Sequence, residues 1–184
     1  MLYPKDFYFI RHGETDWNRE RRGMGQQDIP LNATGILQVE AAVEKLHELP
    51  IELICHSPLK RAQKTAEIIA NRLELPLLNV PELIECSWGI CEGKPKGKWL
   101  EDWVNGSEIE GAASYRSFID RAVRGINEAL KNKEQHILIV SHGGVFWAVQ
   151  EFARLGENIE LPNARPVFLK APTEAEDAWT CTSL

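Results

Sequence analysis

The sequence has few cysteines, and nothing pairs them. Four occur in 184 residues, at Cys55, Cys86, Cys91 and Cys181, without a Cys-x-x-Cys motif or the spacing of a disulfide scaffold. The first residues, Met1–Tyr3, lack the features of a secretory signal peptide. Because unpaired thiols are typical of reducing compartments, we expect a cytoplasmic protein with free cysteines.

Long apolar runs and an excess of positive charge are also missing. The longest weakly polar run, 137–150, is too short to cross a bilayer and carries His142 in its middle, so we expect no membrane insertion. The formal net charge is −6, so the average field of the protein repels polyanions and argues against nucleic acid as a partner. A small anionic substrate is compatible with this charge where basic side chains gather locally.

No internal repeat, charge block or long linker divides the chain. Hydrophobic residues make up 43% of it and charged residues 26%, as in ordinary globular proteins. The length suits one domain, at about 150 residues per domain. Such a chain buries roughly two-thirds of its surface without the help of a disulfide or a metal. We therefore expect a single domain over residues 1–184.

Three short apolar runs, Phe7–Ile10, Ile51–Cys55 and Ile137–Val140, are continuous rather than alternating. This pattern is typical of strands covered on both faces in a parallel sheet. Segments with helical periodicity separate them, and the alternation predicts a three-layer α/β/α sandwich with a mostly parallel central sheet. Further elements are expected as helices over about 34–49, from Ser57-Pro58 with Ser57 as N-cap, from Ser114, and from near Gly144 to Phe152, and as strands at Val167–Lys170 and Trp179–Thr182.

Histidine and arginine stand at the ends of the predicted strands. Arg11-His12 follows the first apolar run, His142 follows the third, and Arg61 lies one helical turn beyond the second. Since ligands bind beyond the carboxyl ends of the strands in such sheets, we expect these side chains to converge. Glycine follows each histidine, at Gly13 and Gly143, which lets backbone N–H groups approach a ligand. The helix that opens there adds a dipole that favours an anion.

This set of side chains suits phosphoryl transfer. Arg11 and Arg61 can each form paired hydrogen bonds with phosphate oxygens. A neutral His12 can attack phosphorus and carry the phosphoryl group, while His142 donates hydrogen bonds to the oxygens that gain charge. Glu85, in a partly desolvated site that keeps it protonated, is the candidate proton donor to the leaving oxygen.

Several nearby residues have two interpretations. Glu82 and Glu92 compete with Glu85 for the acid role, because they are close to it in the sequence. Asn18 either lines the pocket or caps a helix, and Glu14 is better suited to orient an arginine than to do chemistry. The basic cluster at 19–22 is expected to be a solvated face.

Two other mechanisms fit the residues less well. Cys55 and Arg61 have the C-x5-R spacing of cysteine-dependent tyrosine phosphatases, but the residues between them include no glycine and lose one N–H donor at Pro58. His12 and His142 could ligate a metal, but two arginines in the same pocket would repel a cation. We therefore expect neither a metal nor another cofactor.

Five short motifs occur in a fixed order along nearly the whole chain. They are Arg11–Thr15, which continues into Trp17-Asn18; Asp28–Asn32 followed by Gly35; Ser57–Ala62 followed by Thr65–Glu67; Leu83–Glu85 followed by Gly89, Glu92 and Gly93; and Ser141–Gly144. Together they resemble the motifs of the histidine phosphatase superfamily, in its phosphoglycerate-mutase-like branch. This resemblance implies a phosphohistidine at His12, proton donation by Glu85, phosphate binding by Arg11, Arg61 and His142, a place in the pocket wall for Asn18, and no metal.

The chain also departs from the mutases of this branch. Where mutases carry a basic residue after the acid, this sequence has Cys86, and no later arginine pair follows. The insertions that lengthen mutases are absent as well, so hydrolysis is expected rather than mutase action. Met24 and Ala113 stand where relatives often have a small hydroxyl residue and a glutamate, which leaves the non-phosphate part of the substrate open.

We thus expect a metal-independent phosphomonoester hydrolase that acts through a covalent phosphohistidine on a small phosphorylated metabolite. One alternative is a phosphoglycerate-mutase-type phosphotransferase with the same intermediate. Another is an inactive phospho-ligand-binding protein, which the retained His12, His142 and Glu85 argue against. Neither the physiological substrate nor the oligomeric state follows from the sequence.

The segment 95–113 is expected to cover the pocket as a mobile lid. It is polar and contains three glycines, while Trp99 and Trp103, four residues apart, are expected to pack as a helical stripe. Its acidic residues are expected to disfavour highly anionic substrates; they are Glu101, Asp102, Glu108 and Glu110.

Overall fold

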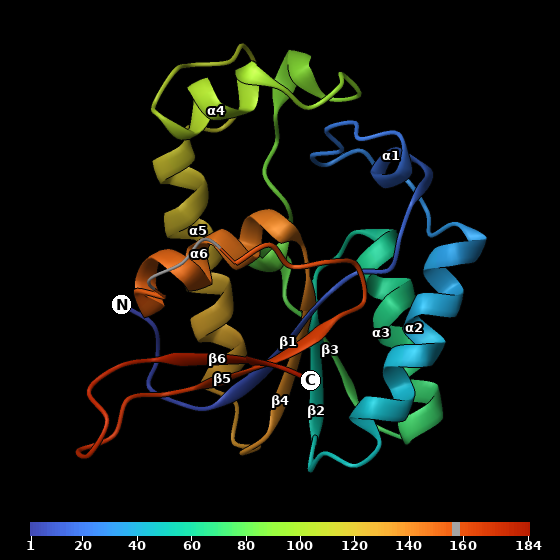
Figure 1. The fold of residues 1–184 in the computed structure, drawn as a ribbon, viewed down its shortest axis with the longest axis vertical. Coiled ribbons are helices and arrows are strands. Elements are labelled where there is room, and N and C mark those ends of the chain that lie inside the picture. The colour runs from blue at the N-terminus through green and yellow to red at the C-terminus, as the bar shows by residue number, and fades with distance from the viewer. Residues whose placement is uncertain (156–158) are drawn as a thin grey trace.

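A six-stranded mixed sheet forms the centre of the protein in the computed structural model, which describes residues 1–155 and 159–184 (Figure 1). The strand order is β3-β2-β4-β1-β5-β6. The first four are parallel, whereas β5 pairs antiparallel with both β1 and β6. The strands are β1 (Phe7–Arg11), β2 (Leu53–His56), β3 (Leu77–Asn79), β4 (Ile137–Ser141), β5 (Pro166–Lys170) and β6 (Thr180–Ser183).

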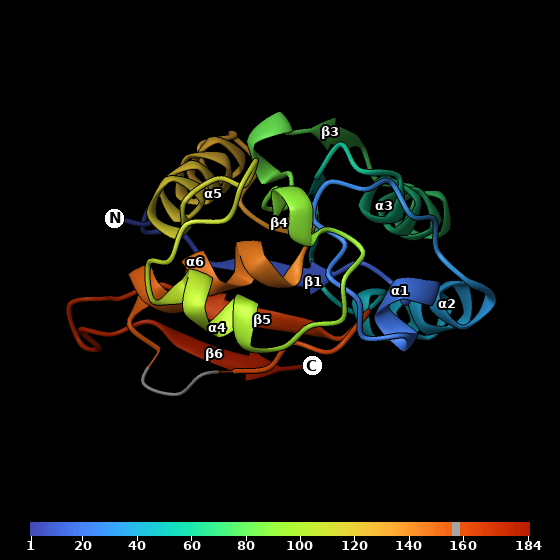
Figure 2. The ribbon, with the colours of Figure 1, turned by 90° about the horizontal axis from the view of Figure 1, so that it is seen from above.

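Two pairs of helices cover the two faces of this sheet (Figure 2). Alternate residues of β1 serve the two layers: Phe7 and Phe9 pack in one core, and Tyr8 and Ile10 in the other. The first core lies under α5 (Tyr115–Leu130) and α6 (Gly143–Ala153), and the second under α2 (Ala33–Leu46) and α3 (Lys60–Leu73). The prediction of a three-layer α/β/α sandwich is therefore confirmed. No helix in the described part of the chain is both long and apolar enough to span a membrane.

Several short elements were not predicted, because they are too short to show a hydrophobic period. They are α1 (Asp16–Arg19), the 3-10 turns η1 (Pro81–Leu83) and η2 (Gly89–Cys91), and β3, whereas α4 (Lys98–Val104) carries the expected helical stripe of Trp99 and Trp103. A four-residue helix makes about one turn, and β3 lies at the sheet edge with Leu77 40% exposed. Both α1 and α4 lie at the same end of the molecule, at the top of Figure 1.

Several boundaries of these elements differ from the prediction. The second strand starts at Leu53 because Ile51 is still part of a turn, with its N–H donating to the carbonyl of Leu49 at 2.8 Å. The helix α2 begins after Asn32, whose Oδ1 accepts the N–H of Gly35 at 2.8 Å, and it ends before residue 49. Both late strands are present, with β6 starting one residue later than predicted.

The two predicted serine caps have different outcomes. Ser114 caps α5, because its Oγ accepts the N–H of Ser117 at 3.2 Å. The prediction for Ser57 is wrong: α3 begins at Lys60 without a side-chain cap. The N–H of Ser57 instead donates to the carbonyl of Val140 at 3.1 Å, which holds Ser57 in line with the strands at the sheet edge.

Candidate active site

The carboxyl ends of β2, β4 and β1, which are neighbours in the sheet, meet at one edge. The N–H of His12 donates to the carbonyl of Ser141 at 3.0 Å, so the backbone pairing continues just past β1. The rings of His12 and His142 are 5.2 Å apart between centroids, in an edge-on arrangement. The structure thus brings the strand-end residues together, as predicted.

Two hydrogen bonds fix the tautomer of His12. Its Nδ1 lies 2.7 Å from the carbonyl oxygen of Gly13, which can only accept, so Nδ1 carries the proton. Arg61 Nε donates to Nε2 at 3.2 Å, and Nε2 therefore presents its lone pair. Burial and the positive charges of Arg61 and Arg11 lower the pKa of His12 well below its ordinary value. The ring is neutral, with a nucleophilic lone pair on Nε2.

Arg61 is fixed from within the protein. Its Nη1 donates to the carbonyl of Gln27 and its Nη2 to that of Gly25, both at 2.8 Å. With the bond to His12, three of about five guanidinium N–H groups are used and two are left. Burial lowers the pKa of Arg61 to about 10. Because this pKa is still well above 7, Arg61 stays cationic at neutral pH. Arg61 can therefore hold His12 and still donate to an anion.

Two buried nitrogens near His12 have no hydrogen-bond partner among the described residues: Arg11 Nε and His142 Nδ1. The rest of each side chain is anchored, because Arg11 Nη1 donates to the carbonyl of Leu161 at 3.1 Å and His142 Nε2 lies 2.7 Å from Ser57 Oγ. Leaving a buried polar group unpaired costs about 1–3 kcal/mol. Both nitrogens therefore indicate a polar ligand, and an oxyanion supplies the acceptors that such N–H donors need.

Ser57 is a site residue that sequence analysis assigned to a helix cap. Its hydroxyl can donate to His142 Nε2, which places the proton of a neutral ring on Nδ1. Burial and the nearby charge of Arg61 lower the pKa of His142 well below its ordinary value, so the ring is neutral. The signal was present in the sequence, because Ser57 follows β2 just as His142 follows the neighbouring strand β4.

Glu85 reaches the site from the segment between η1 and η2 and is 6% exposed. Its Oε2 accepts the N–H of Gly144 at 3.1 Å, and its Oε1 accepts the N–H of Cys86 at 2.9 Å. A Cβ on Gly144 would lie 2.3 Å from Oε1, so the carboxylate can approach α6 only because this residue is glycine. In these contacts both oxygens act as acceptors.

The two competing glutamates point elsewhere. Glu82 forms an ion pair with Arg124 of α5 at 3.1 Å. Glu92 accepts the backbone N–H of Gln26 at 2.9 Å and the side-chain N–H of Gln27 at 2.7 Å. Of the three carboxylates, Glu85 is the one that lines the pocket with His12.

Arg121, on α5, holds the Glu85 segment in place. Its Nη1 donates to the carbonyls of Glu82 and Ile84, both at 2.6 Å, and its Nη2 to that of Glu85 at 3.1 Å. One guanidinium thus fixes three carbonyls of the segment that carries the candidate acid. No sequence pattern pointed to Arg121, because Glu82 lies 39 residues away along the chain.

Asn18 fulfils both roles that the sequence left open. It lines the pocket, while its Oδ1 accepts the N–H of Thr15 in the capping box of α1 and an N–H of Asn163, both at 3.2 Å. Glu14 was expected to orient an arginine, and this expectation is wrong. Glu14 accepts an N–H of Asn32 at 2.9 Å and so supports the cap of α2 rather than an arginine.

The glycines that follow the two histidines differ from the expectation. The N–H of Gly13 donates to Thr65 Oγ1 at 3.1 Å, and a Cβ at Gly13 would meet the carbonyl of Gly35 at 2.5 Å. Gly13 is therefore required by packing and does not present its N–H to a ligand. Gly143 lines the pocket, but a Cβ there would lie 3.7 Å from Arg11, an ordinary contact.

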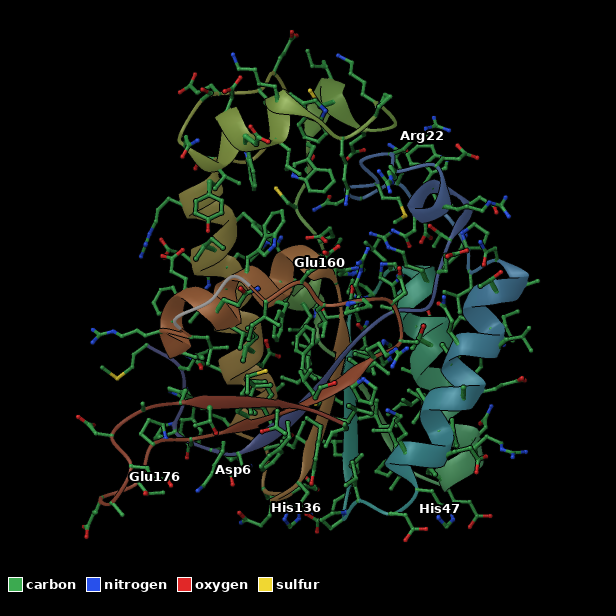
Figure 3. All side chains as sticks on the ribbon, viewed as in Figure 1. Asp6, Arg22, His47, His136, Glu160 and Glu176 are labelled. Carbon is green, nitrogen blue, oxygen red and sulfur yellow. The ribbon has the colours of Figure 1, made fainter. Side chains whose placement is uncertain are left out.

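One pocket of about 360 Å³ collects six of the seven predicted site residues: Arg11, His12, Asn18, Arg61, Glu85 and Gly143. The seventh, His142, is fully buried next to His12. Sequence analysis did not assign several other residues that line this pocket, among them Arg22, Trp88, Lys96 and Glu160. Figure 3 labels Arg22, on the segment after α1, and Glu160, on the segment after α6; both line the pocket.

The expectation of a solvated basic face at 19–22 is correct for Arg19 and wrong for Arg22. Arg19 is exposed and pairs with Asp16 at 2.8 Å. Arg22 is half-buried, with its guanidinium 4.0 Å from the centre of the Trp17 ring and its Nε donating to the carbonyl of Gly93 at 2.6 Å. These contacts keep the Arg22 side chain in the wall of the pocket.

The structure places Cys55 away from the chemistry. It is fully buried in β2, within the core under α5 and α6, and burial raises its pKa to about 12. A thiol held protonated cannot act as the nucleophile of a C-x5-R phosphatase. Within the described part of the chain, no three His, Cys, Asp or Glu side chains gather closely enough to hold a metal ion.

The segment 95–113 is tied to the core by tryptophan. Trp103 is fully buried and its Nε1 donates to the carbonyl of Ala113 at 2.8 Å. The Trp88 ring lies 5.5 Å from Trp99 and 6.4 Å from Trp103, which confirms the predicted packing of the two helical tryptophans. None of the four acidic residues expected to repel anions is among the residues that line this pocket of about 360 Å³.

Comparison with known proteins gives relatives that are named as phosphatases and relatives that are named as phosphoglycerate mutases. The chain is 36% identical over 175 residues to "Uncharacterized phosphatase PhoE" of Bacillus subtilis (strain 168), covering 92% of this chain and 89% of that protein. It is also 36% identical over 147 residues to "Probable phosphoglycerate mutase GpmB" of Enterobacter sp. (strain 638), covering 74% of this chain and 68% of that one.

Solved structures share the fold. A phosphoglycerate mutase from Thermus thermophilus superposes with a TM-score of 0.77 at 30% identity, over 97% of this chain and 99% of that one. A mycobacterial glucosyl-3-phosphoglycerate phosphatase in complex with VO3 superposes with a TM-score of 0.78 at 23% identity, over 96% and 97%. The family model described as histidine phosphatase superfamily (branch 1) matches residues 7–167. This chain belongs to the histidine phosphatase superfamily.

Proposed function

We propose that the protein is a metal-independent phosphomonoester hydrolase that forms a covalent phosphohistidine at His12. The observation that carries this proposal is the buried, neutral ring of His12, whose Nε2 lone pair lies 3.2 Å from Arg61 Nε. A neutral nucleophile next to a fixed guanidinium suits attack on a phosphate dianion, because the cation offsets the charge that would repel the lone pair.

In the first step, His12 Nε2 attacks phosphorus, and the bond from phosphorus to the leaving oxygen breaks as the P–N bond forms. Arg11 and Arg61 neutralise the phosphoryl oxygens, and His142 Nδ1–H donates to the charge that develops there. Glu85 gives a proton to the leaving oxygen, so the product departs as a neutral alcohol.

In the second step, a water oxygen attacks phosphorus, the P–N bond breaks, and its electron pair returns to His12 Nε2. Glu85 accepts the proton of the water, which restores its protonated form for the next cycle. Inorganic phosphate leaves. The guanidinium groups of Arg11 and Arg61 supply the positive charge that a metal ion would otherwise bring, and they would repel such an ion.

Hydrolysis is favoured over mutase action by the residue that follows the acid. Cys86 is buried, its Sγ contacts the carbonyl of Ser87 at 3.3 Å, and burial raises the pKa of its thiol. It offers no positive charge to hold the carboxylate of a phosphoglycerate.

A small phosphomonoester in the cytoplasm is the partner that we propose for this site. The pocket of about 360 Å³ holds a phosphate and a modest part of the attached group. Phosphate release from a panel of phosphomonoesters, read beside conversion of phosphoglycerates, separates hydrolysis from mutase action.

The nucleophile is tested with His12→Ala. We expect this variant to lose hydrolysis of an aryl phosphate by at least about a thousandfold, and rapid-quench labelling of the wild-type protein to give an acid-labile adduct at His12. Cys55→Ser is the matched control and should keep most of the activity, as should the wild-type protein in EDTA. Activity that survives His12→Ala but not Cys55→Ser would instead support a cysteine mechanism.

A further inference from the structure

A second, larger cavity lies next to the catalytic pocket. It is a groove of about 1110 Å³, three times the volume of the pocket of about 360 Å³. Five residues line both cavities and form their shared wall: Arg11, Asn18, Arg22, Lys96 and Glu160. The groove therefore adjoins the pocket in which the phosphate of a phosphomonoester would sit beside His12.

The groove concentrates positive charge in a chain whose formal net charge is −6. Six basic residues line it, against two carboxylates, Glu101 and Glu160; the basic residues are Arg11, Arg21, Arg22, Lys45, Lys96 and Arg165. An excess of this kind, on a protein whose average field repels anions, is local electrostatic complementarity for an anionic group.

Arg21 and Arg165 line the groove but not the catalytic pocket, so they lie beyond the shared wall. Both are exposed, and neither has a carboxylate within 4.0 Å among residues 1–155 and 159–184. Lys45, the other basic residue beyond the wall, is engaged by the carbonyl of Leu184. The charges of Arg21 and Arg165 are thus not balanced by neighbours in the described part of the chain.

The backbone that presents these two arginines adopts an uncommon conformation. Arg21 has φ of 55°, and Ala164, just before Arg165, has φ of 50°. Both are in the left-handed region that residues other than glycine rarely occupy. The strain is held by hydrogen bonds, since the carbonyl of Arg21 accepts the N–H of Lys96 at 2.9 Å and the N–H of Ala164 donates to the carbonyl of Arg11 at 3.0 Å.

We propose that the groove binds a second anionic group of the substrate, a phosphate or a carboxylate, through Arg21 and Arg165. This inference rests on the proposed hydrolysis at His12. Because both arginines lie beyond the wall that the two cavities share, the second group must be separated from the reacting phosphate by a spacer. The substrate class is therefore an elongated phosphomonoester with an anionic far end, rather than a compact phosphoglycerate.

Matched synthetic substrates test the proposal. The main comparison is octanediol bisphosphate against octanediol monophosphate. The phosphate ester of a long ω-hydroxy acid serves as the substrate with a carboxylate at its far end. The bisphosphate and monophosphate of propanediol form the corresponding short pair. For the wild-type protein we expect kcat/KM to be about tenfold higher for the long bisphosphate than for the long monophosphate. The short pair should show no such gain, because its second phosphate cannot pass the shared wall.

Two variants then assign the gain to the groove. Arg21→Ala and Arg165→Ala should each lower the ratio between long bisphosphate and long monophosphate about threefold, mainly through KM, and the double variant should bring the ratio close to one. Arg19→Ala is the matched control, since Arg19 is an exposed arginine of the same segment that lines neither cavity, and it should keep the wild-type ratio. A gain with the carboxylate substrate assigns the site to either anion, and a gain with the bisphosphate alone assigns it to phosphate.

The proposal is overturned if the wild-type ratio is close to one, or if the double variant keeps the full gain. Failure of the proposed hydrolysis has a different signature: no phosphate would be released even from the monophosphates. In that event, equilibrium dialysis with the wild-type and double-variant proteins still measures how much more tightly octanediol bisphosphate binds than octanediol monophosphate. Equal affinity of the wild-type protein for the two compounds would then reject the proposed anion site in the groove.

Discussion

At the scale of single residues, the role of each histidine depends on one hydrogen-bond partner. The carbonyl of Gly13 places the proton of His12 on Nδ1 and leaves Nε2 to attack. The hydroxyl of Ser57, 2.7 Å from His142 Nε2, engages the other ring in the same tautomer at Nε2 and leaves its Nδ1–H to donate. Two rings in one site are thus given a nucleophilic and a donating role by partners that do not react.

We predict that Ser57→Ala lowers kcat about tenfold with little change in KM, because the His142 ring loses its hydrogen-bond partner at Nε2. Steady-state hydrolysis of an aryl phosphate measures this effect. Ser57→Thr, which keeps the hydroxyl, should recover most of the rate. Ser141→Ala is the matched buried serine, since its Oγ donates to the carbonyl of Leu83 instead, and an equal loss in both alanine variants would contradict the assignment.

At the scale of elements, two helices on the same face of the sheet position the candidate acid. Arg121 of α5 holds the carbonyls of the Glu85 segment, and the first turn of α6 offers the N–H of Gly144 to the carboxylate. The sequence predicted both helices correctly, yet neither helical period reveals these contacts. They arise because α5 and α6 pack side by side over the same core.

We predict that Gly144→Ala slows hydrolysis of an alkyl phosphate far more than that of a nitrophenyl phosphate. The new Cβ would lie 2.3 Å from Glu85 Oε1 and displace the group that protonates a poor leaving oxygen, whereas nitrophenolate leaves without a proton. We expect a loss of about a hundredfold for the alkyl ester. Gly143→Ala should have a smaller effect, because its Cβ makes an ordinary contact at 3.7 Å.

Glu85→Gln should reproduce this dependence on the leaving group without altering α6. Equal losses on the two esters in both variants would show that Glu85 is not the proton donor. Chemical denaturation of each variant separates such a loss from unfolding.

At the scale of the whole molecule, the site lowers stability in acid. Burial and the neighbouring arginines lower the pKa of His12 and of His142 in the folded protein, whereas both rings titrate near pH 6.5 when unfolded. Below that pH, these two histidines bind protons in the unfolded chain but not in the native state. The free energy of unfolding therefore increases with pH in this range, and its full value is present above about pH 6.5.

We predict that the free energy of unfolding falls by up to about 1.4 kcal/mol per pH unit for each of these two histidines as the pH drops below about 6.5. Urea denaturation at a series of pH values measures the slope. His12→Gln removes one titrating group and should reduce the slope. A wild-type slope that His12→Gln does not alter would contradict the prediction.

The order of helices and strands and the residues that end the strands could be predicted because both depend on local sequence. Apolar runs mark buried strands, and in a parallel sheet the residues that follow them must meet at one edge, which is why Arg11, His12, Arg61 and His142 converge. Only the folded structure decided which side chains complete the site. Arg121 and Glu82 are 39 residues apart, and Arg21 and Arg165 share one groove from opposite ends of the chain. The packing of loops and helices brings such residues together, and this packing has no periodic signal in the sequence.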